Sequence, residues 1–318
     1  MRTAIHFLNV GDGDCILLEN NGLFGLIDTG ETATHPQRGE QDYGNPYIST
    51  GNGYTHKVIS YIGKVFRQSY PQQVPALQFI IATHSHSDHI GSIADILVNS
   101  GFIVNALYAN PYSHPANLLS SSRIPSCDRR FDNQFQYDRM HQHALWYKKT
   151  RNAGFQYITD LSNYRFIPLG DMSLELLNSV PSPQYDENMN SIVIKLRYWG
   201  CVAALMGDFQ NDQNSTERED NIKEKIGRVN ILKLAHHGLS YSSSPNFLQH
   251  LNPDIVINSG ARSNLESNKY KPLKVLENLN TDVYCTTETD EALVIELKKK
   301  VVTATKVCMD INGSYIMA

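Results

Sequence analysis

Four side chains that can bind a metal ion lie close together in this 318-residue chain. They are His84, His86, Asp88 and His89. Three imidazoles and one carboxylate suit a borderline cation such as zinc far better than magnesium or calcium. The alternative is a polar surface loop that happens to hold histidines, which would leave this density unexplained. We therefore interpret the stretch as a metal-binding motif.

The flanking residues place this motif on a loop between a strand and a helix. Residues 77–82 are apolar and rich in β-branched side chains, which predicts a buried strand. After the motif, isoleucine and leucine recur at helical spacing until Gly101 ends the pattern. A loop between two such elements can present side chains from a rigid scaffold.

Other predicted strands end in groups of the same chemical kind. The strand 23–27 ends at Asp28, the strand 201–206 ends at Asp208, and the apolar run 229–234 ends at His236 and His237. Each group alone could be a turn residue or a structural histidine. Sites on α/β sheets form where strand ends converge, so together these groups indicate one site.

These residues resemble the pattern of the metallo-β-lactamase superfamily over nearly the whole chain. The resemblance implies an α/β fold, a four-layer αβ/βα sandwich with two mixed β-sheets. It also implies two divalent metal ions, zinc by the imidazoles, with manganese as the alternative. By position, one metal would take His84, His86 and Asp208; the other would take Asp88, His89, Asp208 and a late histidine. Asp28 would orient a ligand imidazole.

One departure from the superfamily concerns the first metal. Most members carry a further ligand histidine before the strand pair that ends in the bridging aspartate, and residues 181–191 contain none. Asn190 or water would stand in its place. The first metal is therefore expected to have fewer protein ligands, and β-lactamase activity is disfavoured.

Residues 7–14, 188–191 and 236–238 resemble a particular branch of the superfamily. They are similar to hydrolase domains attached to DNA-uptake competence channels. With the glycine-rich insertion after Asp28, they resemble phosphorylcholine esterases of bacterial choline-binding surface proteins more closely still. That resemblance implies that His237 binds metal and that His236 acts in catalysis with Asp88. Periodicity alone does not separate the two neighbouring histidines.

The function implied is hydrolysis of a phosphodiester by hydroxide held between two metals, with a protonated His236 assisting. A narrower hypothesis is an aromatic face for a quaternary ammonium group, against the simpler view that these aromatics pack the loop. Its candidates are Tyr43, Tyr47 and Tyr54, then Trp146 and Tyr147.

Two alternatives remain open at this point. The first is a nuclease or cyclic-nucleotide phosphodiesterase, which would grip a short strand with Arg123, Arg129, Arg130 and Arg139. The second, of another class, is a non-catalytic binding protein that keeps its metals for stability. The metal-binding Asp88 and His89 argue against that second alternative.

Bulk properties set further expectations. A net charge of -4 provides no footprint for a long nucleic acid, so small or short substrates are favoured. No apolar run reaches membrane-spanning length and no signal-peptide pattern opens the chain, which predicts a cytoplasmic protein, or a secreted one whose leader was removed. The five scattered cysteines are expected to be reduced. The oligomeric state is not predicted.

The remaining pattern predicts one domain over residues 1–318, with loop insertions at about 31–54 and 110–138. A capping box of Thr216 and Glu219 predicts a helix that stops at Gly227. Pro245 and Pro272 predict two helix starts. Other expected strands are 4–8, 14–19, 103–108, 172–177, 191–197, 255–258, 283–285, 292–297 and 301–305, with helices near 58–66 and 141–152.

Overall fold

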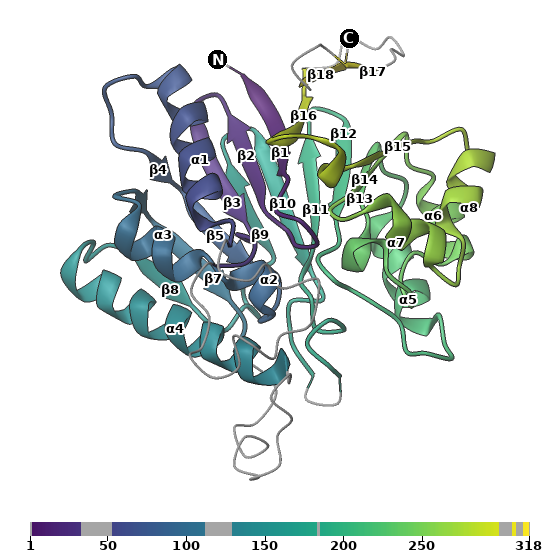
Figure 1. The fold of residues 1–318 in the computed structure, drawn as a ribbon, viewed down its shortest axis with the longest axis horizontal. Helices are drawn as coiled ribbons and strands as arrows, with labels where there is room; N and C mark the ends of the chain where they lie inside the picture. Colours follow the sequence, from purple (N-terminus) through teal and green to yellow (C-terminus); the bar gives the residue numbers. More distant parts are fainter. Residues whose placement is uncertain are drawn as a thin grey trace.

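A computed structural model of the chain describes residues 2–32, 53–111, 133–182 and 185–298, and the backbone of 129–132, 307–309 and 314–317. Most described strands belong to two large mixed sheets (Figure 1). The first is nine-stranded, in the order β17-β18-β16-β1-β2-β3-β5-β7-β8. The second is seven-stranded, in the order β15-β14-β13-β12-β11-β10-β9. A third sheet is the two-stranded pair β4-β6.

The strands of the first sheet are β1 (Thr3–Leu8), β2 (Ile16–Asn20), β3 (Leu23–Ile27), β5 (Phe79–Ala82), β7 (Ala106–Ala109), β8 (Gln156–Ile158), β16 (Ala292–Glu296), β17 (Val307–Met309) and β18 (Ser314–Met317). Those of the second are β9 (Phe166–Leu169), β10 (Met172–Leu177), β11 (Val193–Tyr198), β12 (Cys201–Leu205), β13 (Ile231–Lys233), β14 (Ile255–Asn258) and β15 (Asp282–Cys285). The small pair is β4 (Ala76–Leu77) and β6 (Ile103–Val104).

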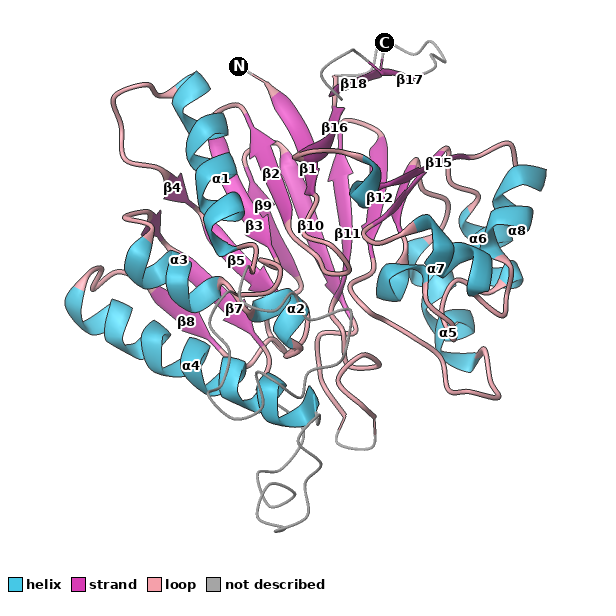
Figure 2. Cartoon of the chain, in the orientation of Figure 1, coloured by secondary structure: helices cyan, strands magenta, loops and turns pink. Residues whose placement is uncertain are grey.

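Helices lie on the outer sides of the two sheets (Figure 2). The first sheet is accompanied by α1 (Thr55–Ser69), α2 (Ser87–Ile90), α3 (Ile93–Asn99) and α4 (Arg129–Thr150). The second is accompanied by α5 (Glu217–Ile226), α6 (Pro245–Leu251), α7 (Arg262–Ser267) and α8 (Pro272–Asn278). Two short 3-10 turns complete the described elements, η2 (Ala235–Gly238) and η3 (Thr286–Glu288).

Three hydrophobic cores show that these elements form four layers. In β1, Ala4 and Leu8 pack in the core under α1, α3 and α4, whereas Ile5 and Phe7 pack in the core between the sheets. Side chains alternate across a strand, so one strand serves two cores. A third core joins the far face of the second sheet to its helices. The expected four-layer sandwich with two mixed sheets is confirmed.

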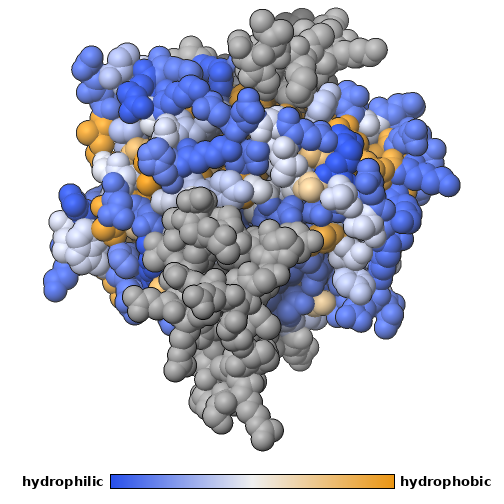
Figure 3. Space-filling model, viewed as in Figure 1, coloured by the Kyte–Doolittle hydropathy of each residue, from blue (hydrophilic) through white to orange (hydrophobic). Residues whose placement is uncertain are grey.

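The surface seen in Figure 3 is mainly hydrophilic, with small separate apolar patches outside the grey region. Isolated apolar residues of this kind are ordinary on soluble surfaces. Among the described helices, none combines the length and the apolar character needed to cross a bilayer.

Several predicted elements occur where the sequence pattern placed them. The opening hairpin pairs β1 with β2, and β10 and β14 have the predicted bounds. Pro245 and Pro272 open their helices, and Gly227 ends α5 with φ +68°. The predicted strand 301–305 and most of both insertions lie outside the described residues. That residues 1–318 form one domain stays a prediction.

Two local predictions are wrong because tertiary contacts override the local pattern. The capping box does not form: Glu219 accepts backbone N–H bonds from Ser243 and Ser244, and Thr216 donates to Asp220. The helix α4 begins at residue 129 rather than near 141. Its early turns are polar, but Asn133 accepts the backbone N–H of Ser87 at 2.9 Å and so ties the helix to the histidine motif.

The sequence pattern also missed β8, β9, β17, β18 and α7. The structure divides two runs that were each predicted as one strand, 77–82 into the end of β4 and β5, and 103–108 into β6 and β7. Two-residue strands such as β4 and β6 are too short to show a period of two. Their pairing depends on the partner strand and not on their own residues.

Candidate metal centre

The predicted site residues come from the carboxyl ends of strands in both sheets. Asp28 follows β3 and the histidine motif follows β5, both in the first sheet. Asp208 follows β12, and His236 and His237 follow β13, both in the second. Since β3 and β5 are parallel, and β12 and β13 are parallel, each pair of ends meets at one edge. The two edges face each other at this centre.

One group of potential ligands contains Asp88, His89, Asp208 and His237, whose ligand atoms all lie within 4.8 Å of one another. The Nε2 atoms of His89 and His237 lie 3.1 and 3.2 Å from Oδ1 of Asp208. Nε2 of His237 is also 3.5 Å from Oδ2 of Asp88. Two sheets thus contribute to one compact donor set.

A second group contains His84, His86 and Asp208, again with ligand atoms within 4.8 Å. Nε2 of His84 lies 3.8 Å from Oδ2 of Asp208. The two oxygens of Asp208 therefore face different groups, Oδ1 toward the first and Oδ2 toward the second. This is the geometry of a carboxylate that can bridge two cations.

Hydrogen bonds behind the ligands determine which nitrogen of each imidazole faces inward. Asp28 accepts the backbone N–H and the hydroxyl of Thr83, and Nδ1 of His89 donates to it at 2.8 Å. Nδ1 of His237 donates to the carbonyl of Ser259 at 3.0 Å. Because Nδ1 of each imidazole is engaged as the donor, the inward Nε2 is the nitrogen that could give up its proton and offer a lone pair to a cation.

The Nε2 atoms of His89 and His237 and the Asp208 carboxylate crowd together, and a cation between them would stabilise this arrangement. The two Nε2 atoms are 3.3 Å apart, and both face the same carboxylate oxygen. Buried Nε2 of His84 and Oδ1 of Asp208 have no hydrogen-bond partner among the described residues. Imidazole and carboxylate donors in this arrangement fit two divalent cations that share Asp208.

The electrostatics agree with this donor set. Burial, reinforced by the imidazoles of His89 and His86, holds the pKa of His84 well below its usual value. Burial also lowers the pKa of His237, but the Asp208 carboxylate outweighs it and raises that pKa to about 10. The site therefore favours positive charge around Asp208.

His236 and His237 point to different places because both have left-handed backbone conformations, with φ of 51° and 52° in η2. The side chain of His237 is 3% exposed and that of His236 is 21% exposed. Nε2 of His236 lies 4.0 Å from Oδ2 of Asp208 and 3.2 Å from Nδ2 of Asn188. Burial lowers the pKa of His236 to about 4, so the expected protonated imidazole is wrong for neutral pH.

Asn190 has a different place from the one expected. Its amide oxygen accepts the N–H of Ser182, and its nitrogen donates to the carbonyls of Ser182 and Tyr185. It holds the loop before β11, while Asn188 from the same loop contacts His236. Burial lowers the pKa of His86, although the carboxylates of Asp88, Asp208 and the buried Glu187 oppose the shift.

Sequence reasoning also missed residues behind the ligands, notably Asp14, Lys233 and Ser259. Asp14 and Lys233 are buried and bonded to each other. Their signal was an isolated lysine inside the apolar run 229–234 and an aspartate beside the first turn. Neither residue has a sequence neighbour that indicates its partner.

The aromatic candidates for a cation face are largely committed to other contacts. Tyr147 is buried and bonded to the backbone of Phe102 and Val104, so this candidate is wrong. Lys57 lies over the ring of Tyr54 at 5.9 Å, and Arg151 lies over Trp146 at 5.7 Å. Tyr43 and Tyr47 lie outside the described residues.

Of the four arginines expected to bind a nucleic acid, the structure describes the side chain of Arg139 alone, and that side chain is engaged elsewhere. Arg139 donates to Asp95 at 2.6 Å, and its side chain is 14% exposed. It braces the segment after the histidine motif, so its assignment to strand binding is wrong. Arg123 and the side chains of Arg129 and Arg130 lie outside the described residues.

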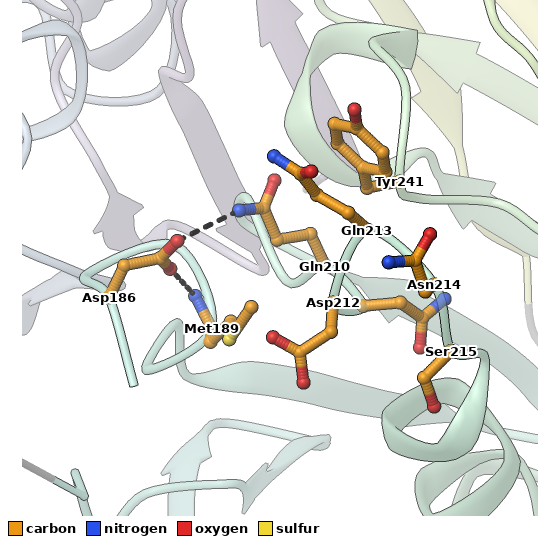
Figure 4. Close-up of a pocket in the computed structure, with 9 residues that line it drawn as sticks. Asp186, Met189, Gln210, Asp212, Gln213, Asn214, Ser215 and Tyr241 are labelled. Atoms are coloured by element: carbon orange, nitrogen blue, oxygen red, sulfur yellow. Dashed lines mark hydrogen bonds between the residues drawn. The ribbon is translucent and has the colours of Figure 1, made fainter. Parts of the chain in front are cut away.

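A cavity of about 530 Å³ lies on loops that continue from the centre (Figure 4). Gln210 follows Asp208 by two residues, and Met189 adjoins Asn188. Figure 4 shows Asp186 bonded to both Gln210 and Met189 at one side of the cavity. Its lining also includes Asn211, Asp212, Gln213, Asn214, Ser215 and Tyr241, so the nine lining residues include no lysine or arginine.

No protein-family model matches the chain. ComE operon protein 3 of Bacillus subtilis (strain 168) is 22% identical over 298 residues, which are 93% of this chain and 33% of that protein. The chain thus spans a third of its curated relative.

Solved structures resemble the chain in fold. The metallo-beta-lactamase fold protein YhfI from Bacillus subtilis has a TM-score of 0.50 at 12% identity, covering 92% of this chain and 99% of that one. Igni18, a metallo hydrolase from the archaeon Ignicoccus hospitalis, has a TM-score of 0.43 at 15% identity, covering 93% and 100%. With its two facing mixed sheets and their outer helices, the chain has the metallo-β-lactamase fold.

Proposed function

We propose that this protein is a metal-dependent hydrolase that cleaves a phosphodiester bond. The observation that carries the proposal is the placement of Asp208, whose two oxygens face two separate groups of imidazole and carboxylate donors. His84 and His86 would hold one divalent cation, and Asp88, His89 and His237 the other. Two bound divalent cations would supply an activated water at neutral pH and would neutralise charge on a phosphate.

A protein side chain would donate the hydrogen bond to the phosphate or to the leaving group. His236 lies at the edge of the donor set, is partly exposed and is neutral at pH 7, so it can hold a proton on one ring nitrogen. Asn188 contacts its Nε2 and orients the ring. We assign His236 to a hydrogen bond with a phosphate oxygen or with the departing alkoxide.

The cavity on the loops that follow Asp208 and Asn188 has a polar lining, which suits a polar leaving group. Its lining contains the carboxylates of Asp186 and Asp212 and several amides, without a basic side chain. Lys269, over the ring of Tyr241 at 4.3 Å, and Arg218, which donates to the carbonyl of Met189, border this lining, so its charge is mixed. The net charge of -4 gives a long polyanion little attraction to the chain as a whole. This favours a small phosphodiester, which includes a phosphorylcholine-like substrate, over a long nucleic acid.

Hydrolysis of bis(p-nitrophenyl) phosphate tests the proposal. Zinc- or manganese-loaded protein should release nitrophenol, and Asp88→Asn should abolish turnover while the fold persists. The matched control is Asp160→Asn, because Asp160 is an exposed aspartate whose carboxylate bonds to the neighbouring Ser162. Wild-type protein with two bound metals and no turnover on a panel of phosphodiesters would contradict the proposal and favour the binding-protein alternative.

A comparison of substrates tests the nature of the leaving group. p-Nitrophenylphosphorylcholine should be cleaved with a higher kcat/KM than an analogue that has an uncharged group in place of the ammonium. Equal kcat/KM values would exclude recognition of the cation. Cleavage of single-stranded DNA at a higher kcat/KM than either would favour the nuclease alternative instead.

A further inference from the structure

We propose that Lys233 and Asp14 form a buried positioning pair that holds the two halves of the metal centre in register. The inference rests on the proposed metal binding, but it does not depend on phosphodiester hydrolysis. Neither residue belongs to the two donor groups that share Asp208. Each contacts the backbone or side chains that position those donors.

Lys233 is the last residue of β13 and has no solvent exposure. A lysine this deeply buried is rare, and its charge is tolerated only with close partners. Its Nζ donates to Oδ2 of Asp14 and, at 3.0 Å, to the carbonyl of Gly207. Both partners belong to the walls of the metal centre.

The contact with Gly207 acts on the second-sheet half. Gly207 precedes Asp208 and has φ +52°, a conformation that suits glycine. Its carbonyl accepts both the Lys233 ammonium and, at 3.1 Å, the backbone N–H of His236. Lys233 thereby fastens the turn that presents the bridging carboxylate.

Asp14 connects this half to the first sheet. Its backbone N–H donates to the carbonyl of Asp88 at 3.3 Å, and its carbonyl accepts the N–H of Gly30 at 2.7 Å. Its Oδ1 accepts the hydroxyl of Ser259, the residue whose carbonyl orients His237. The pair therefore links Asp88 on one sheet with His237 and Asp208 on the other.

The ion pair also decides what Asp14 does. Asp14, Asp28 and His89 form a third group close enough to hold a metal. The Lys233 ammonium already binds the Asp14 carboxylate and compensates its buried charge. Asp14 thus accepts hydrogen bonds that position the ligands. It does not itself bind a metal, because its carboxylate is paired with Lys233.

The test compares metal binding in the wild type, Asp14→Asn and the double variant Asp14→Asn/Lys233→Met. The double variant removes both charges at once, and replacing a buried ion pair by neutral groups commonly leaves stability intact. Metal content, chelator competition and the absorption spectrum of the cobalt(II)-loaded protein are measured. Lys195→Met is the matched control, because Lys195 is a nearly buried lysine in the same sheet that donates to the carbonyl of Lys225.

We expect the double variant to melt as a folded protein but to bind metal about 10 to 100 times more weakly, with an altered cobalt spectrum. Lys195→Met should keep wild-type values. If the double variant does not fold, Asp14→Asn/Lys233→Gln, which removes both charges and keeps both side chains polar, makes the same comparison, because Asp14→Asn alone would leave the Lys233 ammonium buried without its carboxylate. Wild-type affinity and spectrum in the folded variants would overturn the inference. Wild-type protein that binds no metal would instead overturn the proposed centre, and metal binding without turnover would overturn only the proposed hydrolysis.

Discussion

At the scale of the residue, the turn through His236 and His237 separates two identical side chains. Two successive non-glycine residues in the left-handed region cost about 1–2 kcal/mol each. The backbone of Leu239 closes the turn by donating to the carbonyl of His236 at 2.7 Å. Hydrogen bonds from the side chains of Asn264 and Asn268 to the carbonyls of His237 and Gly238 offset part of this cost. The turn directs one imidazole into the donor set and the other to its edge.

This separation predicts different consequences for two neighbouring substitutions. His237→Ala should reduce bound metal from two ions to at most one, because it removes a donor from the group that contains Asp88 and His89. His236→Ala should keep both metals and lose about 10²- to 10⁴-fold in kcat. Metal analysis and phosphodiester kinetics measure the two effects, with the exposed His56→Ala as control. Loss of metal in His236→Ala would reverse the assignment.

At the scale of the element, α4 is held against the motif side of the first sheet by polar contacts. Arg139 bonds Asp95 of α3, and Asp95 also accepts the hydroxyl of Thr32 at 3.0 Å. Asn133 of α4 bonds the backbone at Ser87, where α2 begins. The helix thus stabilises the motif through an ion pair and hydrogen bonds. The polar sequence of α4 gives no indication of these partners.

The bracing predicts that Arg139→Met destabilises the fold. Because the pair with Asp95 is mostly buried, the loss should be about 1–3 kcal/mol of unfolding free energy. Arg165→Met is the control, since the side chain of Arg165 is 73% exposed in its pair with Glu175 and should cost under about 1 kcal/mol. Urea denaturation measures both. Unchanged stability together with weakened single-strand binding would restore the nucleic-acid role of Arg139.

A pH-dependent contact links β1 to α1. His6 is fully buried, with Nδ1 2.9 Å from the hydroxyl of Tyr61 and Nε2 3.2 Å from Glu19. Burial, helped by the charge of Arg2, lowers the pKa of His6 although Glu19 opposes the shift. The unfolded chain therefore binds the proton more readily, and the contact loses stability as pH falls below about 6.5.

The difference in unfolding free energy between the wild type and His6→Gln is expected to depend on pH. Near pH 7.5 the wild type should be more stable, because its neutral imidazole keeps both contacts. Between pH 6.5 and 5 this difference should shrink, because in the wild type the unfolded chain takes up a proton on His6 that the folded protein does not bind. Urea denaturation at several pH values measures it, and the metal-site histidines are common to both proteins. A gap that stays constant over this range would show that His6 does not titrate.

At the scale of the whole molecule, the centre joins two sheets that otherwise meet through an apolar core. The donors of the first group come from both sheets, so metal binding is coupled to the packing of the sheets. A cation that binds only the folded state stabilises it by mass action.

Metal removal should therefore lower the melting temperature of the whole protein in one cooperative transition. At free metal 100 times Kd the stabilisation is about 2.7 kcal/mol per site. Calorimetry with and without a chelator measures it, and restored zinc should recover the original melting temperature. If the melting temperature is the same with and without the chelator, the donors do not bind metal in solution.

The sequence by itself determined the donor types, their strand-end positions and the four-layer fold. The donor types and positions follow from local signals, a dense histidine motif and apolar runs that end in aspartate or histidine. The fold follows from the resemblance of these motifs to the metallo-β-lactamase superfamily. Only the tertiary structure decided which side chains support the donors. Asp14 and Lys233 are 219 residues apart in sequence, and Arg139 and Asp95 are 44 apart. The physical reason is that a buried charge is stabilised by whichever partner the folded backbone brings within hydrogen-bonding distance, and no periodicity along the chain encodes that distance.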